Sequence, residues 1–124
     1  ENVTIGESIK NVINHYGTPI YSYNPNNQEK YYEFHTNKGV LVVTAIGKKN
    51  TGYVTRVSMT YNQANGPTYQ KVAQSVGKKA IKRVQYNSVS GNFAYIQNGK
   101  TSYQFGSSSP KDKVLKLYRI DINK

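Results

Sequence analysis

Apolar residues recur at helical spacing in two segments of the chain, and each segment ends at a glycine. The i, i+3, i+4, i+7 pattern of an amphipathic helix comprises Ile9, Val12, Ile13 and Tyr16 before Gly17. It returns 60 positions later as Tyr69, Val72, Ala73 and Val76 before Gly77. We therefore predict helices over about 6–16 and 68–76 and, because the pattern repeats, two copies of one structural unit.

The residues around both segments carry helix start and stop signals. Thr4 and Glu7 have the spacing of a capping box, in which each side chain accepts a hydrogen bond from a free N–H group at the start of a helix. Gly17 suits the left-handed conformation that ends a helix, and Pro19 prevents the helix from resuming. Pro67 suits the first turn of the second helix.

Four segments after each predicted helix have the composition of β-strands, with alternating or continuous apolar residues bounded by turn residues. After the first helix they are residues 21–23, 30–36, 40–46 and 53–61. After the second helix they are residues 80–86, 92–97, 100–105 and 114–122. Asn98 and Gly99 form a two-residue hairpin signal. Because strands adjacent in sequence commonly pair, these segments predict antiparallel meanders.

This element order predicts an α+β fold made of two tandem repeats, each a helix followed by a four-stranded antiparallel sheet, that share one core. We place the repeats at residues 1–62 and 63–124, and we align their last strands by matching 54–57 with 114–117. A unit of about 60 residues buries too little surface to be stable alone. We therefore expect residues 1–124 to form a single domain.

The chain is strongly basic, and the excess lies in its second half. Lys and Arg number 17 against 6 acidic residues, a net charge of +11, of which residues 1–62 carry +2 and residues 63–124 carry +9. This asymmetry suggests a polyanionic or acidic partner, although a solvated basic face is the commoner explanation of such an excess. The residues that would bind a polyanion are Lys78, Lys79, Lys82, Arg83, Lys111, Lys113 and Arg119. Because lysine dominates, they suit nonspecific attraction to teichoic acid, glycosaminoglycan or nucleic acid.

Tyrosine is abundant, with 12 residues, and it supplies rigid contact area that is common in protein interfaces. The tyrosines that crowd into the first half are Tyr21, Tyr23, Tyr31, Tyr32 and Tyr53. Adjacent Tyr31 and Tyr32 must point to opposite faces of the sheet, so at least one should lie outside the core. We expect this surface, with Arg56 or Lys116 at its rim, to bind a protein partner. The other interpretation is that the tyrosines only fill half-buried strand positions.

The sequence contains no pattern typical of a catalytic or metal site. Cysteine is absent, which excludes thiol catalysis, disulfides and thiolate metal sites. His15 and His35 are the only side chains that titrate near neutral pH, and no third ligand is patterned beside them. Gly-x-Ser-x-Gly, Walker and dinucleotide motifs are missing. We therefore expect no enzyme activity, no metal and no cofactor.

Residues 5–19, with the sequence IGESIKNVINHYGTP, resemble the I-G-x-s-x-x-x-V-x-x-x-x-G-x-P opening of the beta-lactamase-inhibitor-protein-like superfamily. That group includes SmpA/OmlA-type outer-membrane lipoproteins and domains found beside CAP domains in secreted Gram-positive proteins. The second copy keeps Val72 and Gly77 but lacks the leading Ile-Gly and the final Pro. The resemblance implies tandem helix-plus-four-stranded units with a concave, often aromatic surface that binds other proteins, and it assigns no catalytic residue.

These observations predict a secreted, non-enzymatic, inhibitor-like module that presents a tyrosine-rich sheet surface to a protein partner. The alternative is a cell-envelope module that binds a polyanion through the second repeat. No apolar run is long enough to span a bilayer. The chain begins without Met, as a protein cleaved after a signal peptide would, or one shortened in another way. Abundant Asn, Tyr and Lys without Cys or Trp favour a secreted or cell-wall-associated protein of a Gram-positive bacterium.

Overall fold

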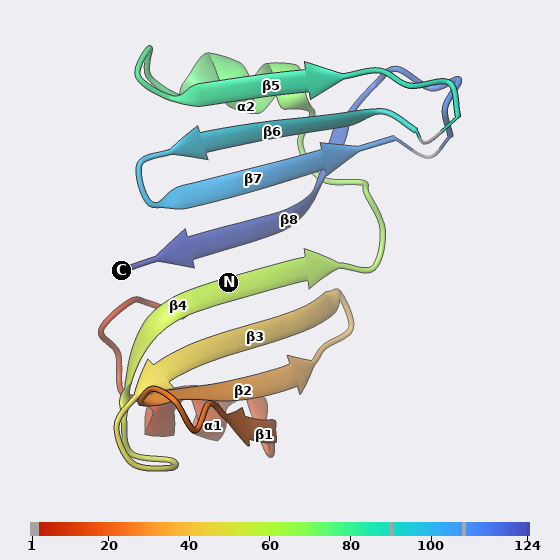
Figure 1. Cartoon of the computed structure of the whole chain (residues 1–124). Helices are drawn as coiled ribbons and strands as arrows, with labels where there is room; N and C mark the ends of the chain where they lie inside the picture. Colours follow the sequence, from red (N-terminus) through yellow and green to blue (C-terminus); the bar gives the residue numbers. More distant parts are fainter. Residues whose placement is uncertain (1–2, 90, 108) are drawn as a thin grey trace. The chain divides into compact units, whose positions relative to one another are not determined.

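The computed structural model describes residues 3–89, 91–107 and 109–124, which divide into two compact units (Figure 1). Unit 1 comprises the chain up to Met59 together with Ile122–Lys124, and unit 2 comprises Thr60–Asp121. The elements that begin in unit 1 are α1 (Ile9–Tyr16), β1 (Ile20–Tyr23), β2 (Glu29–His35), β3 (Gly39–Ile46) and β4 (Tyr53–Tyr61). Those that begin in unit 2 are α2 (Tyr69–Ser75), β5 (Ile81–Gln85), β6 (Phe93–Asn98), β7 (Thr101–Gly106) and β8 (Lys116–Asn123).

The predicted fold class is wrong. The strands form one eight-stranded antiparallel sheet with the order β1-β2-β3-β4-β8-β7-β6-β5, rather than two helix-plus-four-stranded repeats that share a core. The helices have only 8 and 7 residues, about two turns each, so neither forms a layer large enough to enclose a joint core. The buried cluster around Phe105 draws on residues of unit 2 alone. In the coarse sense the chain is α+β, because an antiparallel sheet is combined with two short helices.

In unit 1 the helix packs on one face of the strands. Tyr32 of β2 lies opposite Tyr21 of β1 and Val43 of β3, so these side chains share a face. The ring of Tyr16, at the end of α1, lies 5.4 Å from the ring of Phe34 on the same face. Figure 1 shows α1 behind β2. The buried apolar residues of unit 1 are Ile9, Val12, Tyr32, Phe34, Leu41, Val43, Ala45, Val54, Val57 and Met59.

In unit 2 the core lies between α2 and strands β6, β7 and β8. Ala94 lies opposite Phe105, and Ile96 lies opposite Tyr103, so these four side chains share a face. The ring of Tyr69 in α2 meets the ring of Phe105 edge-on, with their centroids 5.5 Å apart. No residue of α2 is buried, however, although the structure describes all of it. All five residues of β5, which lies at the end of the sheet order, are exposed.

The prediction that Thr4 is the N-cap of the first helix is wrong. Helix α1 begins at Ile9 with Ser8 as its N-cap, whose hydroxyl accepts a hydrogen bond from the Lys10 N–H group. Thr4 is therefore outside the helix. The Glu7 carboxylate accepts a hydrogen bond from the Thr4 N–H group at 2.8 Å, as in half of a capping box. The pair thus closes a turn before the helix instead of starting it.

Similar backbone hydrogen bonds tie the segment before each helix to a strand. The Gly6 N–H group donates to the Val54 carbonyl at 2.8 Å, and the Gly66 N–H group donates to the Leu117 carbonyl at 3.3 Å. In both cases the strand residue donates back to the carbonyl that follows the glycine. These bonds match Val54 with Leu117, whereas the sequence offset matched Val57 with Leu117. That alignment is wrong by three residues, because the chain from helix to strand is longer by three residues in unit 2.

Candidate functional site

Tyr31 and Tyr32 point to opposite faces of β2, and only Tyr31 is accessible. Tyr32 has an exposed fraction of 0%, and its hydroxyl accepts a hydrogen bond from the Asn50 N–H group at 2.9 Å. Tyr32 is thus a core residue, and its inclusion among the partner-binding residues is wrong. Tyr31 is half-buried on the face of β2 opposite α1, where its hydroxyl donates to Oε1 of Glu29 at 3.0 Å.

The face that carries Tyr31 is named here the helix-free face of unit 1. Strand register assigns to it Ile20, Ser22, Glu29, Tyr31, Glu33, His35, Val40, Val42, Thr44 and Ile46. Glu29 also accepts a hydrogen bond from Nη2 of Arg56 on β4 at 3.4 Å. The Nε atom of Arg56 donates to Oδ1 of Asn123 at 2.9 Å. A tyrosine, a carboxylate and an arginine from two strands therefore form one network on this face.

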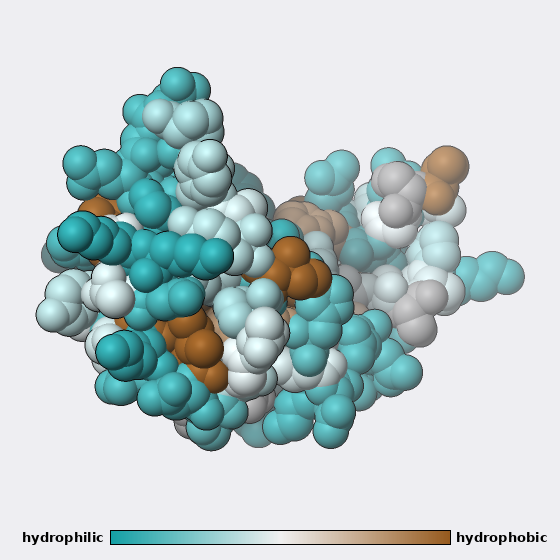
Figure 2. Space-filling view, turned by 90° about the horizontal axis from the view of Figure 1, so that it is seen from below, coloured by the Kyte–Doolittle hydropathy of each residue, from teal (hydrophilic) through white to brown (hydrophobic). Residues whose placement is uncertain are grey.

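Apolar side chains lie among these polar groups. Ile20 is 61% exposed and Ile46 is 44% exposed. Ile20 lies opposite Glu33, which lies opposite Val42. In the view from below in Figure 2, the visible surface is mostly hydrophilic, and brown apolar atoms form small separate groups. The helix-free face of unit 1 thus combines isolated apolar side chains with polar and aromatic ones, a mixture that is common in protein interfaces.

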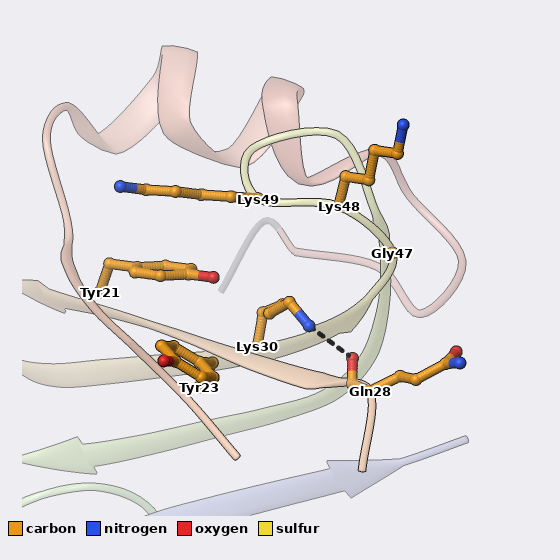
Figure 3. A pocket seen from close by; sticks show the side chains of 7 residues that line it. All are labelled: Tyr21, Tyr23, Gln28, Lys30, Gly47, Lys48 and Lys49. Carbon is orange, nitrogen blue, oxygen red and sulfur yellow. Dashed lines mark hydrogen bonds between the residues drawn. The ribbon is translucent and has the colours of Figure 1, made fainter. Parts of the chain in front are cut away.

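Tyr21 and Tyr23 lie on the helix side of β1 rather than beside Tyr31. Tyr23 lies opposite Lys30 in the register of β1 and β2, and the two tyrosine rings are 6.3 Å apart at an angle of 32°. They line a pocket of about 580 Å³, named here the tyrosine-lysine pocket (Figure 3). Its lining residues are Tyr21, Tyr23, Gln28, Lys30, Gly47, Lys48 and Lys49.

A tight turn between β3 and β4 supplies two lysines to this pocket. Gly47 has a φ of +132°, and a Cβ atom at this position would lie 2.7 Å from the Cα atom of Gly52. Only glycine therefore permits this approach of the two backbones. The buried hydroxyl of Tyr32 holds the Asn50 N–H group of the same turn. The core of unit 1 thus positions the turn that carries Lys48 and Lys49.

The pocket contains positive charge and hydrogen-bond donors. The Nζ atom of Lys49 lies 4.6 Å from the centroid of the Tyr21 ring, a cation-π contact. The Nζ atom of Lys30 donates to the Gln28 carbonyl at 3.4 Å. Partial burial raises the pKa of Tyr21, and the neighbouring Tyr32 and Tyr23 add to this rise. The Tyr21 hydroxyl therefore remains protonated at neutral pH and able to donate a hydrogen bond.

The remaining members of the predicted partner surface are dispersed. Tyr53 is 62% exposed at the start of β4, where it forms a β-bridge with Ser8. Lys116 is exposed at the start of β8 in unit 2 and forms a β-bridge with Thr68. Arg56 alone joins Tyr31 in one hydrogen-bonded network, through Glu29. The structure therefore does not bring the five tyrosines together on one surface.

The basic residues predicted for polyanion binding are also spread out. Lys78 and Lys79 are exposed in the turn before β5. Lys82 lies opposite Ile96 and Arg83 lies opposite Tyr95, so Lys82 and Arg83 are on opposite faces of β5. A flat polyanion could not engage both side chains from one face.

The three basic residues near the end of unit 2 have different surroundings. Lys111 and Lys113 are exposed in the loop before β8, and Nζ of Lys113 lies 5.8 Å from the ring centroid of Tyr86. Arg119 donates two hydrogen bonds to the Asp121 carboxylate, at 2.9 and 3.1 Å. This hydrogen bonding raises the pKa of Arg119, although partial burial opposes the rise. Asp121 therefore offsets much of the positive charge that Arg119 would offer to a polyanion.

Sequence reasoning missed the lysines of the tyrosine-lysine pocket. Lys30, Lys48 and Lys49 lie in the half of the chain with the smaller charge excess. The paired Lys48 and Lys49 between two glycines were a visible signal of an exposed basic turn. Nothing in the sequence placed that turn next to Tyr21, because the proximity depends on how β1 packs beside β2.

A family comparison complements this geometry. The family model described as SA0570-like matches residues 1–123. The chain belongs to the SA0570-like family. No curated protein and no solved structure matches it. Neither helix described in this SA0570-like protein combines the length and the apolar character that crossing a membrane requires.

The two histidines of this SA0570-like chain have different surroundings. His35 contacts Glu33 through Nε2 and Oε2 at 2.6 Å, and both side chains are substantially exposed. The ring of His15 meets the ring of Tyr16 edge-on at 4.6 Å. Within residues 3–89, 91–107 and 109–124, no three His, Cys, Asp or Glu side chains are grouped so that they could hold a metal ion. The arrangements best developed in the described chain are therefore the helix-free face of unit 1 and the tyrosine-lysine pocket.

Proposed function

We propose that this protein is a secreted, non-enzymatic module that binds a protein partner through the helix-free face of unit 1. The observation that supports this most directly is the network of Tyr31, Glu29 and Arg56 on a face that α1 leaves uncovered. Tyr and Arg are the side chains most enriched among the residues that dominate binding energy in protein interfaces. Glu29 holds both side chains in defined positions, which lowers the entropy lost on binding.

The surrounding residues suit the same use. Ile20 and Ile46 expose apolar area on this face, and burying it against a partner contributes roughly 25 cal/mol per Å² of apolar surface. Because the network joins β2 to β4, which flank β3 in the sheet, contacts to it draw on two strands. A rigid, mixed surface of this kind favours a folded protein partner over a flexible peptide.

Secretion and an inhibitor-like role are parts of the same proposal. They rest on the composition of the chain and on the resemblance of residues 5–19 to the beta-lactamase-inhibitor-protein-like superfamily. Within that segment Gly17 caps α1 with a φ of +94° and a ψ of −160°, a conformation that favours glycine but differs from the left-handed helical cap. Polyanion binding by the second repeat, residues 63–124, stays the alternative, supported by the charge of +9 on these residues.

The test is capture of partners from culture medium and cell-wall extract by the immobilised protein, followed by affinity measurement with the purified partner. We expect Tyr31→Ala to weaken binding by about 2 kcal/mol, or about 30-fold in Kd. Thermal unfolding should change little, because the Tyr31 side chain is only half-buried.

Tyr95→Ala is the matched control. Tyr95 is also half-buried at the middle of a strand, and its hydroxyl also bonds to a side chain two residues away, at Gln97. Tyr95 lies in unit 2, so its removal should leave partner affinity unchanged. Equal losses in the two variants, or normal binding by Tyr31→Ala, would contradict a binding surface on unit 1.

A further inference from the structure

We propose that the tyrosine-lysine pocket of unit 1 binds a phosphate group carried on a sugar or a polyol. The pocket lies on the helix side of β1, whereas the surface proposed for the protein partner lies on the other side of the strands. The two proposals therefore depend on different residues and can fail separately.

The charge of the lining residues favours an anionic ligand. Three of the seven are lysines, and none is acidic. Glu29, the acidic residue nearest in sequence to Lys30, lies on the opposite face of β2, where it bonds to Tyr31 and Arg56. Ammonium groups gathered without a carboxylate repel one another, and an anion between them relieves that repulsion.

The kind of basic residue favours phosphate over carboxylate. Arginine recognises a planar carboxylate through two parallel hydrogen bonds, whereas lysine acts as a compact point charge that suits a tetrahedral phosphate. The pocket contains no arginine. In Figure 3, Lys30 and Lys49 come from two different segments beside the rings of Tyr21 and Tyr23. Lys49 extends over the Tyr21 ring, and the ammonium group of Lys30 is turned to the Gln28 carbonyl. A phosphate held between these segments would accept hydrogen bonds from both.

The tyrosines favour a ligand that has carbon and hydroxyl groups next to the phosphate. The Tyr23 side chain is 61% exposed, and its ring offers an apolar surface with a hydroxyl at the end. Lys49 lies over the ring of Tyr21, which leaves Tyr23 as the exposed aromatic surface of the pocket. A sugar or a polyol fits one ring, whereas single-stranded nucleic acid binds best to several rings in succession.

The experiment is a titration of the whole protein, followed through its backbone amide NMR signals at low ionic strength. Glucose 6-phosphate and glycerol 3-phosphate test the two carriers, and glucose and inorganic phosphate test each part alone. We expect a Kd on the order of millimolar for at least one phosphate ester, as is usual for a small ligand in an open site. The shifted signals should be those of residues 21–23, 28–30 and 47–50. The carrier that binds more tightly identifies the ligand class.

Variants test whether the pocket is the site. We expect Lys49→Gln and Lys30→Gln each to weaken binding about 5-fold or more, through loss of a charge-assisted contact. Tyr23→Ala should weaken the ester but not inorganic phosphate. Lys10→Gln, at an exposed site on α1, and Tyr86→Ala, at an exposed site in unit 2, should have no effect.

Several results would overturn the proposal. These are absence of shifts at the pocket, inorganic phosphate binding as tightly as both esters, or full affinity in Lys49→Gln. Tighter pocket binding by an oligothymidylate or by polyglutamate than by the esters would instead identify nucleic acid or acidic protein as the ligand. Loss of ester binding with normal partner capture would locate the failure in this proposal alone.

Discussion

Unit 1 packs its helix and its edge strand more tightly than unit 2 does, although both have the same pattern of apolar residues. Val12 of α1 is 2% exposed, whereas no residue of α2 is buried. In β1 only Tyr21 is half-buried, with its ring centroid 5.3 Å from that of Tyr32, whereas every residue of β5 is exposed. The difference shows that the apolar stripe decides which side of a helix faces the sheet. The strands against which the helix packs decide how deeply its side chains are buried.

The comparison of the two units also shows that a larger net charge does not by itself produce a basic pocket. The two units each place a lysine over a tyrosine, Lys49 over Tyr21 and Lys113 over Tyr86. Only unit 1 gathers two further lysines into the same pocket. The half with a charge of +2 thus places three lysines in one pocket, while Lys82 and Arg83 of the half with +9 lie on opposite faces of one strand. Strand pairing, rather than composition, concentrates the charge.

The largest expected difference is between equivalent valines of the two helices. Val12→Ala should lower the free energy of unfolding by about 2–3 kcal/mol, because the Val12 side chain is buried and its removal leaves a cavity. Val72→Ala should lower it by about 1 kcal/mol, because Val72 is only partly buried. Urea denaturation followed by circular dichroism measures both. Equal losses would contradict the difference in packing. Two separate transitions would show that residues 1–124 are not the single domain that the sequence predicts.

A smaller effect is expected from removing one hydroxyl beneath the tyrosine-lysine pocket. Tyr32→Phe should cost about 1 kcal/mol, because the Asn50 N–H group loses its acceptor. Tyr31→Phe removes a more exposed hydrogen bond to Glu29 and should cost less. Amide hydrogen exchange should rise in residues 47–52 for Tyr32→Phe alone. Unchanged exchange there would mean that the core hydroxyl does not hold the turn.

The smallest effects are expected at the ion pairs. Arg119→Gln should lower the free energy of unfolding by at most about 1 kcal/mol, because exposed ion pairs contribute little. Arg56→Gln should lower it by about half as much, because the Arg56–Glu29 pair is longer than the Arg119–Asp121 pair. Raising the salt concentration should reduce both losses. Thermal melts at low and high salt measure them. A larger loss at Arg56 would show that its bond to Asn123 matters more than its charge.

Local signals in the sequence carried much of the secondary structure. The stripe from Ile9 to Tyr16 is a helix that ends at Gly17. The hairpin signal was one residue early, because Asn98 is the last residue of β6 and pairs with Thr101, so Gly99 and Lys100 form the loop. Thr4 was a misleading cap, because the preference for Ser or Thr at a helix start does not distinguish Thr4 from Ser8. The candidate site was harder to predict. The alternation of side chains along a strand predicts that Tyr31 and Tyr32 face opposite sides of the sheet. It does not predict which of the two is buried.

The sequence by itself determined the order of the elements, the absence of thiol chemistry and the excess of positive charge, because spacing and composition are properties of the chain alone. Tertiary structure decided that the strands join in one sheet, that Tyr32 belongs to the core, and that Lys30 and Lys49 line the same pocket as Tyr21. These outcomes depend on contacts between residues far apart in the sequence. Burial of apolar surface stabilises such contacts, but it has no preferred direction. It therefore selects one strand register only when all of the strands are packed together.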